Sequence, residues 1–196
     1  KFKPYCKLSS QKPFADGGLT SPDHYFELRY KLEKDMERAI NLITQTGKEY
    51  KEMFGRELGL VEDYKCGDAD LILVTSGTVG STAKIAVDEL RAKGIKAGNL
   101  RIRVFRPFPM KIVREILSSA KKVAVIDRNI SYGHGGIFYQ EVKSTLYNFT
   151  HKPPIFGFIA GLGGRDITPS DIEEMANYAL QNDCPEEEII WKGVKK

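Results

Sequence analysis

From Asp70 onward, apolar segments alternate with amphipathic ones, and this alternation constrains the fold more than any other feature of the chain. The run "DLILVTSG" is continuously apolar and ends in small residues, which is typical of a strand buried on both faces of a parallel sheet. The next segment, "VGSTAKIAVDELRAKG", has its apolar residues on one helical stripe and ends at a glycine. Strand and helix patterns then recur, with strands expected at 70–77, 100–109, 122–128 and 155–161 and helices at 79–94, 110–120, 137–147 and from Thr168. Four such units predict an α/β fold: an open, mostly parallel sheet with helices on both faces.

The part before this alternation predicts an appendage to the α/β domain. Residues 1–20 contain prolines and adjacent glycines with few periodic apolar positions, as expected for an extended linker. Ser21-Pro22-Asp23 then supplies an N-cap, a proline and an acid for the start of a helix. Apolar residues follow at spacings of three or four up to Gly55, so we expect a long amphipathic helix that packs on a neighbour. Gly47 is the position at which we expect it to weaken or split.

Composition narrows the classes of function. With 196 residues, the chain can bury one ordinary core, and its beginning is typical of a segment of a longer polypeptide. The 30 basic and 26 acidic residues are scattered along the sequence, which argues against nucleic acid as a partner. The sequence has no long apolar run and no signal-peptide pattern, so we expect a cytoplasmic protein without membrane contact. Three separated cysteines without a CxxC motif predict neither a metal nor an iron–sulfur site.

Ligands of open α/β sheets bind beyond the carboxyl ends of the strands, and two glycine-containing loops are expected there. "SGTVGS" could present backbone N–H groups to an anion, but it is not a P-loop, and a simple turn capped by Thr78 or Gly80 is the favoured interpretation. "YGHGGIF" resembles part of a dinucleotide fingerprint, but no acidic residue follows the next strand. This favours a close-approach turn, in which glycines let the following helix pack tightly on the sheet and let another domain's backbone come near. No catalytic residue and no metal ligand is indicated. The weaker candidates for cofactor contact are Ser76, Gly77, Arg128, Gly133, Gly135 and Gly136.

Other polar residues near these loops have simpler interpretations. His134 lies between glycines without a partner at metal spacing, so we expect an exposed turn residue. Asp127 and Arg128 adjoin at a strand end, and a local ion pair between them is the simplest expectation. The acidic run Glu186-Glu187-Glu188 is expected to form a solvated face rather than a catalytic pair.

Three co-linear segments carry a family resemblance: "DADLILVTSGTVGSTAKIAVDELRAKGIKAGNLRIRVFRPFP", "VAVIDRNISYGHGGIFYQEV" and "FGFIAGLGGRDITPSDIEEM". They resemble the C-terminal part of the alpha subunit of pyruvate:ferredoxin oxidoreductases, and more broadly 2-oxoacid:ferredoxin oxidoreductases of anaerobic bacteria and archaea. The upstream "GGLTSPDHYFELRYKLEKDMERA" resembles the join between that subunit's first two domains. This likeness implies a tail of a thiamine-binding-type domain at 1–20, a connecting helical segment at 21–67 and a transketolase C-terminal-like domain at 68–196.

The resemblance also implies an activity for the whole enzyme. A 2-oxoacid, most simply pyruvate, is oxidatively decarboxylated with thiamine diphosphate, magnesium, iron–sulfur clusters and coenzyme A, and ferredoxin is reduced. The expected partners are the missing first domain, the beta, gamma and delta type subunits and, through the whole complex, ferredoxin. This chain lacks the GDG and asparagine motif of thiamine enzymes, with Gly67-Asp68-Ala69 as a near match, and it lacks cluster cysteines. We therefore expect an inactive isolated chain with a structural and assembly role. The alternative is a free-standing module that binds a nucleotide or coenzyme A at the glycine turns.

Overall fold

The computed structural model describes residues 3–4, 6–14 and 17–195. These residues form a six-stranded sheet with the order β1-β3-β2-β4-β5-β6. All neighbouring strands are parallel except β1, which pairs antiparallel with β3 at one edge. The strands are β1 (Val61–Tyr64), β2 (Leu71–Ser76), β3 (Ala97–Ile102), β4 (Lys122–Asp127), β5 (Ile155–Ile159) and β6 (Ile190–Trp191). The mostly parallel sheet expected from the sequence is confirmed.

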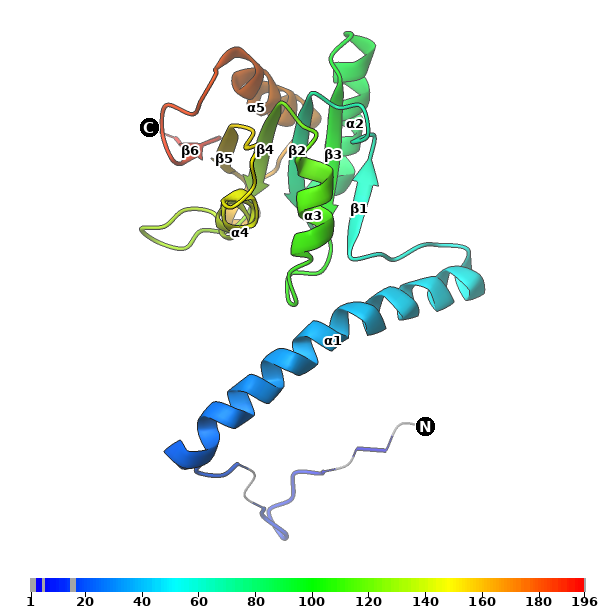
Figure 1. Ribbon diagram of the computed structural model, residues 1–196, viewed down its shortest axis with the longest axis vertical. Helices are drawn as coiled ribbons and strands as arrows, with labels where there is room; N and C mark the ends of the chain where they lie inside the picture. Colours follow the sequence, from blue (N-terminus) through cyan, green and yellow to red (C-terminus); the bar gives the residue numbers. More distant parts are fainter. Residues whose placement is uncertain (1–2, 5, 15–16, 196) are drawn as a thin grey trace.

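Helices cover both faces of this sheet (Figure 1). They are α2 (Val79–Ala92), α3 (Met110–Leu117), α4 (Ile137–Leu146) and α5 (Pro169–Gln181). Side chains alternate along β2, so Leu71 and Leu73 join the core beneath α2 and α5, whereas Ile72 and Val74 join the core beneath α3 and α4. Burial on both faces explains why β2 is continuously apolar in the sequence.

Three features of the sheet differ from the prediction. The strand expected at 100–109 runs from Ala97 to Ile102, because its pairing with β2 ends where Ser76 lies opposite Ile102. The edge strand β1 was not predicted, since its sequence Val-Glu-Asp-Tyr lacks an apolar alternation. The two-residue β6 is too short to leave a periodic pattern.

The long helix α1 (Pro22–Phe54) extends away from the α/β body (Figure 1). It ends at Gly55, which adopts a left-handed conformation with a φ of 68°. The expected break at Gly47 is wrong, since the helix is continuous there. Gly47 is instead buried where the chain returns from the helix, and a Cβ atom at this position would overlap the carbonyl oxygen of Leu58. Close approach of the backbone therefore explains this glycine.

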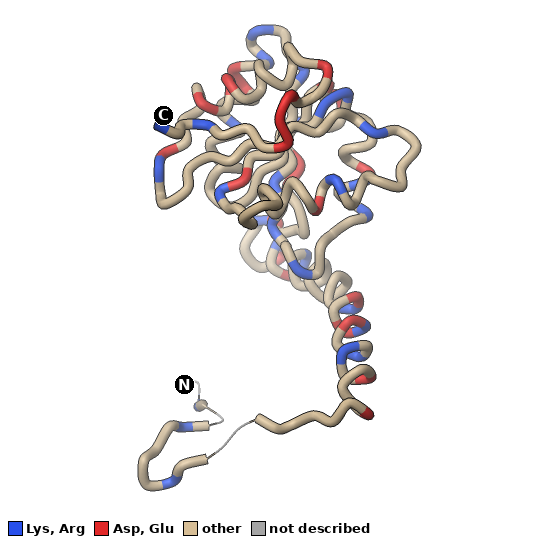
Figure 2. Tube along the Cα trace, turned by 90° about the vertical axis from the view of Figure 1, so that its left-hand side faces the viewer, with Lys and Arg blue, Asp and Glu red and all other residues tan. Residues whose placement is uncertain are grey.

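The predicted linker at 1–20 contains no helix or strand in its described residues, and residues 1, 2, 5, 15 and 16 of it lie outside them. Figure 2 shows Lys and Arg interspersed with Asp and Glu along both α1 and the α/β body. Within the described ranges, no helix has the length and apolar character needed to cross a lipid bilayer.

Candidate functional site

The carboxyl ends of β2, β4 and β5 lie at one edge of the sheet, and the loops that follow them form the region where a ligand is expected. The strand order reverses between β2 and β4, because β3 lies on one side of this pair and β5 on the other. In open α/β sheets the crevice at such a reversal is the usual ligand site. Here it lies between the turn that starts α2 and the loop that follows β4.

The loop after β4 is organised around the carboxylate of Asp127, which is fully buried. One carboxylate oxygen accepts the backbone N–H of Phe138 at 3.1 Å, and the other accepts that of Tyr139 at 3.0 Å. The amide of Asn129 donates to Asp127 at 2.9 Å, and its oxygen accepts the N–H of Ile137 at 2.9 Å. Two side chains of the protein thus fill the N-terminus of α4, where a phosphate would otherwise bind.

Burial raises the pKa of the Asp127 carboxyl, and the hydrogen bonds from Tyr139, Phe138 and Asn129 oppose this shift. The glycine cluster supports the same arrangement. A Cβ atom at Gly136 would overlap the Asp127 carboxylate, and Gly135 has a φ of 89° with the side chain of Ile189 close by. The structure agrees with a close-approach turn at these glycines.

The expected ion pair between Asp127 and Arg128 is wrong. Adjacent residues at the end of a strand point in opposite directions, so Asp127 enters the interior while Arg128 lies over the crevice. Its guanidinium donates to the Thr78 hydroxyl at 3.2 Å and to the Gly161 carbonyl at 3.4 Å. Arg128 therefore bridges the loops on both sides of β4. The cavity beside it, which Thr78, Arg128 and Arg165 help to line, has a volume of only about 80 Å³.

The predicted site residues fall into separate places. Ser76 is the last residue of β2, and Gly77, which follows it, lines a groove with Arg101 and Arg103 on the side of β3. Arg128 lies at the crevice. Gly133 and Gly135 belong to a turn closed by two hydrogen bonds between the backbones of Ser131 and Gly135, and His134 at its tip is exposed as expected. The structure does not gather the six candidates into one site.

A charged cluster lies beside the groove near Gly77. The Glu62 carboxylate forms ion pairs with Lys84, with Arg101 at 3.3 Å and with Arg103 at 2.7 Å. Partial burial acts to raise the pKa of Glu62, but the hydrogen bonds and charges of Lys84 and Arg103 outweigh it and lower that pKa to about 2. One carboxylate thus holds three cations together across β1, β3 and α2.

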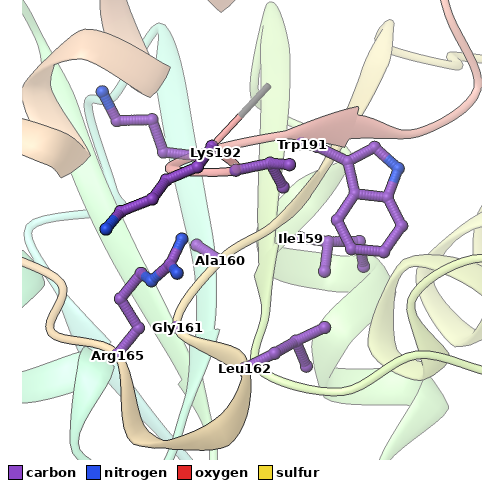
Figure 3. Close-up of a pocket in the computed structure, with 9 residues that line it drawn as sticks. Ile159, Ala160, Gly161, Leu162, Arg165, Trp191 and Lys192 are labelled. Atoms are coloured by element: carbon purple, nitrogen blue, oxygen red, sulfur yellow. The ribbon is translucent and has the colours of Figure 1, made fainter.

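Another cavity lies beyond β5 and β6; the indole of Trp191 lies on one side of it, and Arg165 and Lys192 lie on the other (Figure 3). The sequence prediction missed this site, because these residues belong to two segments that meet only through the parallel pairing of β5 with β6. The one feature of the sequence that could have indicated this cavity is the single tryptophan, Trp191, followed directly by Lys192.

Comparisons with known proteins identify the family. Residues 69–172 match the family model described as pyruvate:ferredoxin oxidoreductase core domain II. The chain is 44% identical over 196 residues to the pyruvate synthase subunit PorA of Methanothermobacter thermautotrophicus, covering 100% of this chain and 49% of that one. It is 39% identical over 196 residues to the ketoisovalerate oxidoreductase subunit VorA of Pyrococcus horikoshii, covering 98% of this chain and 50% of that one.

Among solved structures, a split-gene transketolase described as an inactive beta4 tetramer matches 59% of this chain and 40% of its own, with 20% identity and a TM-score of 0.49. The chain spans about half the length of the curated relatives that it matches. The family model covers more than half of the chain, including β2 to β5 and the helices between them. The chain therefore belongs to the pyruvate:ferredoxin oxidoreductase core domain II family.

Proposed function

We propose that this chain is part of a 2-oxoacid:ferredoxin oxidoreductase that converts pyruvate to acetyl-coenzyme A and CO2 while it reduces ferredoxin. The family assignment supports this reaction class. The identity of 44% to a pyruvate synthase subunit, against 39% to a ketoisovalerate oxidoreductase subunit, favours pyruvate among the 2-oxoacids. Other subunits of the oxidoreductase are then the partners of this chain.

Within that enzyme, the role of this chain is structural rather than chemical. Among the described residues, no group of three His, Cys, Asp or Glu side chains could hold a metal ion. Asp68, in the near match to the thiamine motif, is bound by Arg91 at 2.6 Å. The N-terminus of α4 is filled by Asp127. We infer that other parts of the enzyme hold the thiamine cofactor, the clusters and coenzyme A, because Asp68 and the N-terminus of α4 already have partners within this chain.

The observation that carries the assembly role is the exposed apolar stripe of α1. Tyr25, Leu28 and Leu32 are about half exposed on one side of the helix. The same side of the helix continues with the exposed Phe54 and with four residues that are only partly exposed, Met36, Ala39, Ile43 and Tyr50. Its spacing is close to 3.6 residues, whereas a left-handed coiled coil needs 3.5. A straight stripe fits the surface of a globular domain better than it fits a partner helix.

The occupant of this stripe is the part of the subunit that the relatives have in addition to the matched half. A helix of 33 residues is about 50 Å long, which is enough to cross a whole domain. In this arrangement residues 1–20 are the tail of that other domain, 21–67 connect the two, and 68–196 form the α/β domain. The α/β domain then positions its strand-end loops against neighbouring subunits.

The direct test is reconstitution. The chain is expressed alone, and separately together with the remaining part of the subunit and the other subunits. Reduction of a viologen dye is then measured with pyruvate, 2-oxoglutarate and a branched-chain 2-oxoacid. The expected result is pyruvate-dependent reduction by the assembled complex and none by the chain alone. Failure of the chain to co-purify with the other parts would contradict the proposal.

The alternative of a nucleotide or coenzyme A module at the glycine turns has less support. Its anion would bind the N-terminus of α4, where Phe138 and Tyr139 already donate to Asp127. A ligand phosphate there would face a buried carboxylate at close range, which is repulsive. No observation at these glycines favours a ligand over the turn.

A further inference from the structure

The cavity beyond β5 and β6 has a volume of about 290 Å³ and is separate from the glycine turn. One side of the cavity is formed by the end of β5 and the short 3-10 turn Leu162–Gly164, and the other side is formed by the segment that follows β6. It lies at the carboxyl ends of two parallel strands, the edge of an open α/β sheet at which ligands bind. The lining residues are Ile159, Ala160, Gly161, Leu162, Arg165, Trp191, Lys192, Val194 and Lys195.

One half of this cavity is apolar. In Figure 3 the indole of Trp191 lies on the same side as Ile159 and Leu162. Trp191 is 47% exposed and Leu162 is 38% exposed, although both are large apolar side chains in a domain whose other apolar residues are mostly buried. An open indole face beside aliphatic side chains is a surface on which a planar ring can stack.

The other half of the cavity is cationic. Arg165 donates from one guanidinium nitrogen to the Gly193 carbonyl, and within the described residues this guanidinium forms no ion pair. Lys192 is already paired with Glu174 and with Asp171 at 3.4 Å. Lys195 also lines the cavity, and it forms no ion pair with any residue that the structure describes. The cavity is thus lined by one guanidinium group with a free edge and by one further lysine, the kinds of side chain that recognise a phosphate.

We propose that this cavity binds a nucleoside monophosphate, with the base stacked on Trp191 and Leu162 and the phosphate held by Arg165 and Lys195. The combination of a flat apolar wall and unpaired cations selects a ligand that carries both a ring and an anionic group. Its volume is at the lower end of the range for small-molecule pockets, about 300–1,000 Å³, which favours a mononucleotide over a dinucleotide. This site goes beyond the proposed function, which needs no ligand on this chain.

The test uses Trp191, the only tryptophan of the chain, as an intrinsic reporter. Fluorescence is recorded while the chain is titrated with AMP, adenosine or inorganic phosphate. Saturable quenching by AMP in the micromolar range is expected, with adenosine and phosphate each at least about tenfold weaker because each lacks half of the recognised groups. Calorimetry on the Trp191→Phe variant should still detect AMP, because phenylalanine retains an aromatic surface.

The Arg165→Ala variant should bind AMP at least about tenfold more weakly, because a charge-assisted hydrogen-bonding group is lost. The AMP affinity of Arg165→Lys should lie between those of Arg165→Ala and the unchanged chain, since lysine keeps the charge but not the planar guanidinium group. The matched control is Arg29→Ala, an exposed arginine of α1 remote from the cavity, which should bind like the unchanged chain. Circular dichroism verifies that each variant is folded.

Three results would each overturn the proposal. They are an unchanged AMP affinity in folded Arg165→Ala, an affinity for phosphate alone equal to that for AMP, and AMP binding without a change in Trp191 fluorescence. These readouts are independent of complex assembly, so this site and the proposed function can fail separately.

Discussion

The carboxylate of Asp127 accepts the backbone N–H of Tyr139 at 3.0 Å, and this contact joins the end of β4 to the first turn of α4. The charge that the N-terminus of α4 favours is therefore supplied by the protein itself. A strand, a glycine cluster and a helix in this order suggest a phosphate cradle, but here they form an internal helix cap. The strand–glycine–helix pattern thus places the carboxylate of Asp127 at the N-terminus of α4.

Replacing Asp127 with alanine removes the acceptor of three donors, the N–H groups of Phe138 and Tyr139 and the amide of Asn129. Because these donors lie at a largely buried site, we expect a loss of about 2–4 kcal/mol in the free energy of unfolding, measured by urea denaturation. The control is Asp183→Asn on the exposed surface, which should change stability by less than about 0.5 kcal/mol. Equal stability of the two variants would contradict the capping role.

Gly136→Ala tests the space around the same carboxylate. The new Cβ atom would overlap Asp127, so Asp127 or the start of α4 must move. We expect destabilisation by about 1–3 kcal/mol, and because Gly136 is the N-cap of α4, where alanine is disfavoured, helix preference does not offset the overlap. Gly67→Ala is the matched control, because its Cβ atom would meet no neighbour within 4 Å. Thermal denaturation measures the stability of both variants. If Gly136→Ala is as stable as Gly67→Ala, the close approach of Gly136 to the Asp127 carboxylate does not contribute to stability.

Glu62→Gln tests the charged cluster of β1, β3 and α2. The folded protein lowers the pKa of this carboxyl from an ordinary 4.5 to about 2, so its stabilising effect is complete above pH 4.5 and is lost as the pH falls towards 2. We expect the variant to be less stable at neutral pH by about 1–2 kcal/mol, less than the full linkage value because solvent reaches the cluster. The difference from the unchanged protein should shrink between pH 4.5 and pH 2. Urea denaturation at several pH values measures it, with the exposed Glu52→Gln as control; a difference independent of pH would argue against this linkage.

Gly47→Ala separates local helix preference from tertiary contact. In an isolated helix this change stabilises by about 1 kcal/mol. Here the new methyl group would overlap the Leu58 carbonyl, so we expect the segment after Gly55 to detach from α1. Hydrogen exchange of the N–H groups of Arg103 and Val104, which donate to the Leu60 carbonyl, should become faster, whereas Asn41→Ala on the exposed face should leave it unchanged. Slower exchange in Gly47→Ala would mean that the segment does not depend on this contact.

The features that the sequence predicted well are those set by nearby residues. Apolar runs buried on two faces predicted β2 and β4, and the helix expected from Thr168 is α5, whose start the structure shows to be a capping box of Thr168 and Asp171. The features that it did not predict depend on pairing between distant segments. The start of β3 at Ala97 is fixed by its pairing with β2, and its residues Ala97-Gly98-Asn99 have little strand preference of their own.

The same distinction applies to the candidate site. The role of Asp127 could not be read from the sequence, because the carboxylate reaches N–H groups beyond a turn whose path is not set by local preference. The position of Arg128 follows from the conformation of the loop after β5, which supplies the Gly161 carbonyl. Arg165 and Trp191 line one cavity only because β6 adds to the edge of the sheet. Contacts of this kind require the tertiary structure.

We propose that this chain serves assembly through the apolar stripe of α1, and a single charged substitution in that stripe is the sharpest test of this role. In the complete complex, Leu32→Glu places a charge in the stripe, while Asn41→Glu places the same charge two and a half turns further, on the opposite side of the helix. Assembly is measured by size-exclusion chromatography with light scattering, together with pyruvate-dependent dye reduction per assembled complex. We expect Leu32→Glu to lower the assembled fraction at least about tenfold, with an unchanged rate in the complexes that remain, and Asn41→Glu to assemble normally. Full assembly of Leu32→Glu, with or without a loss of rate, would contradict this role.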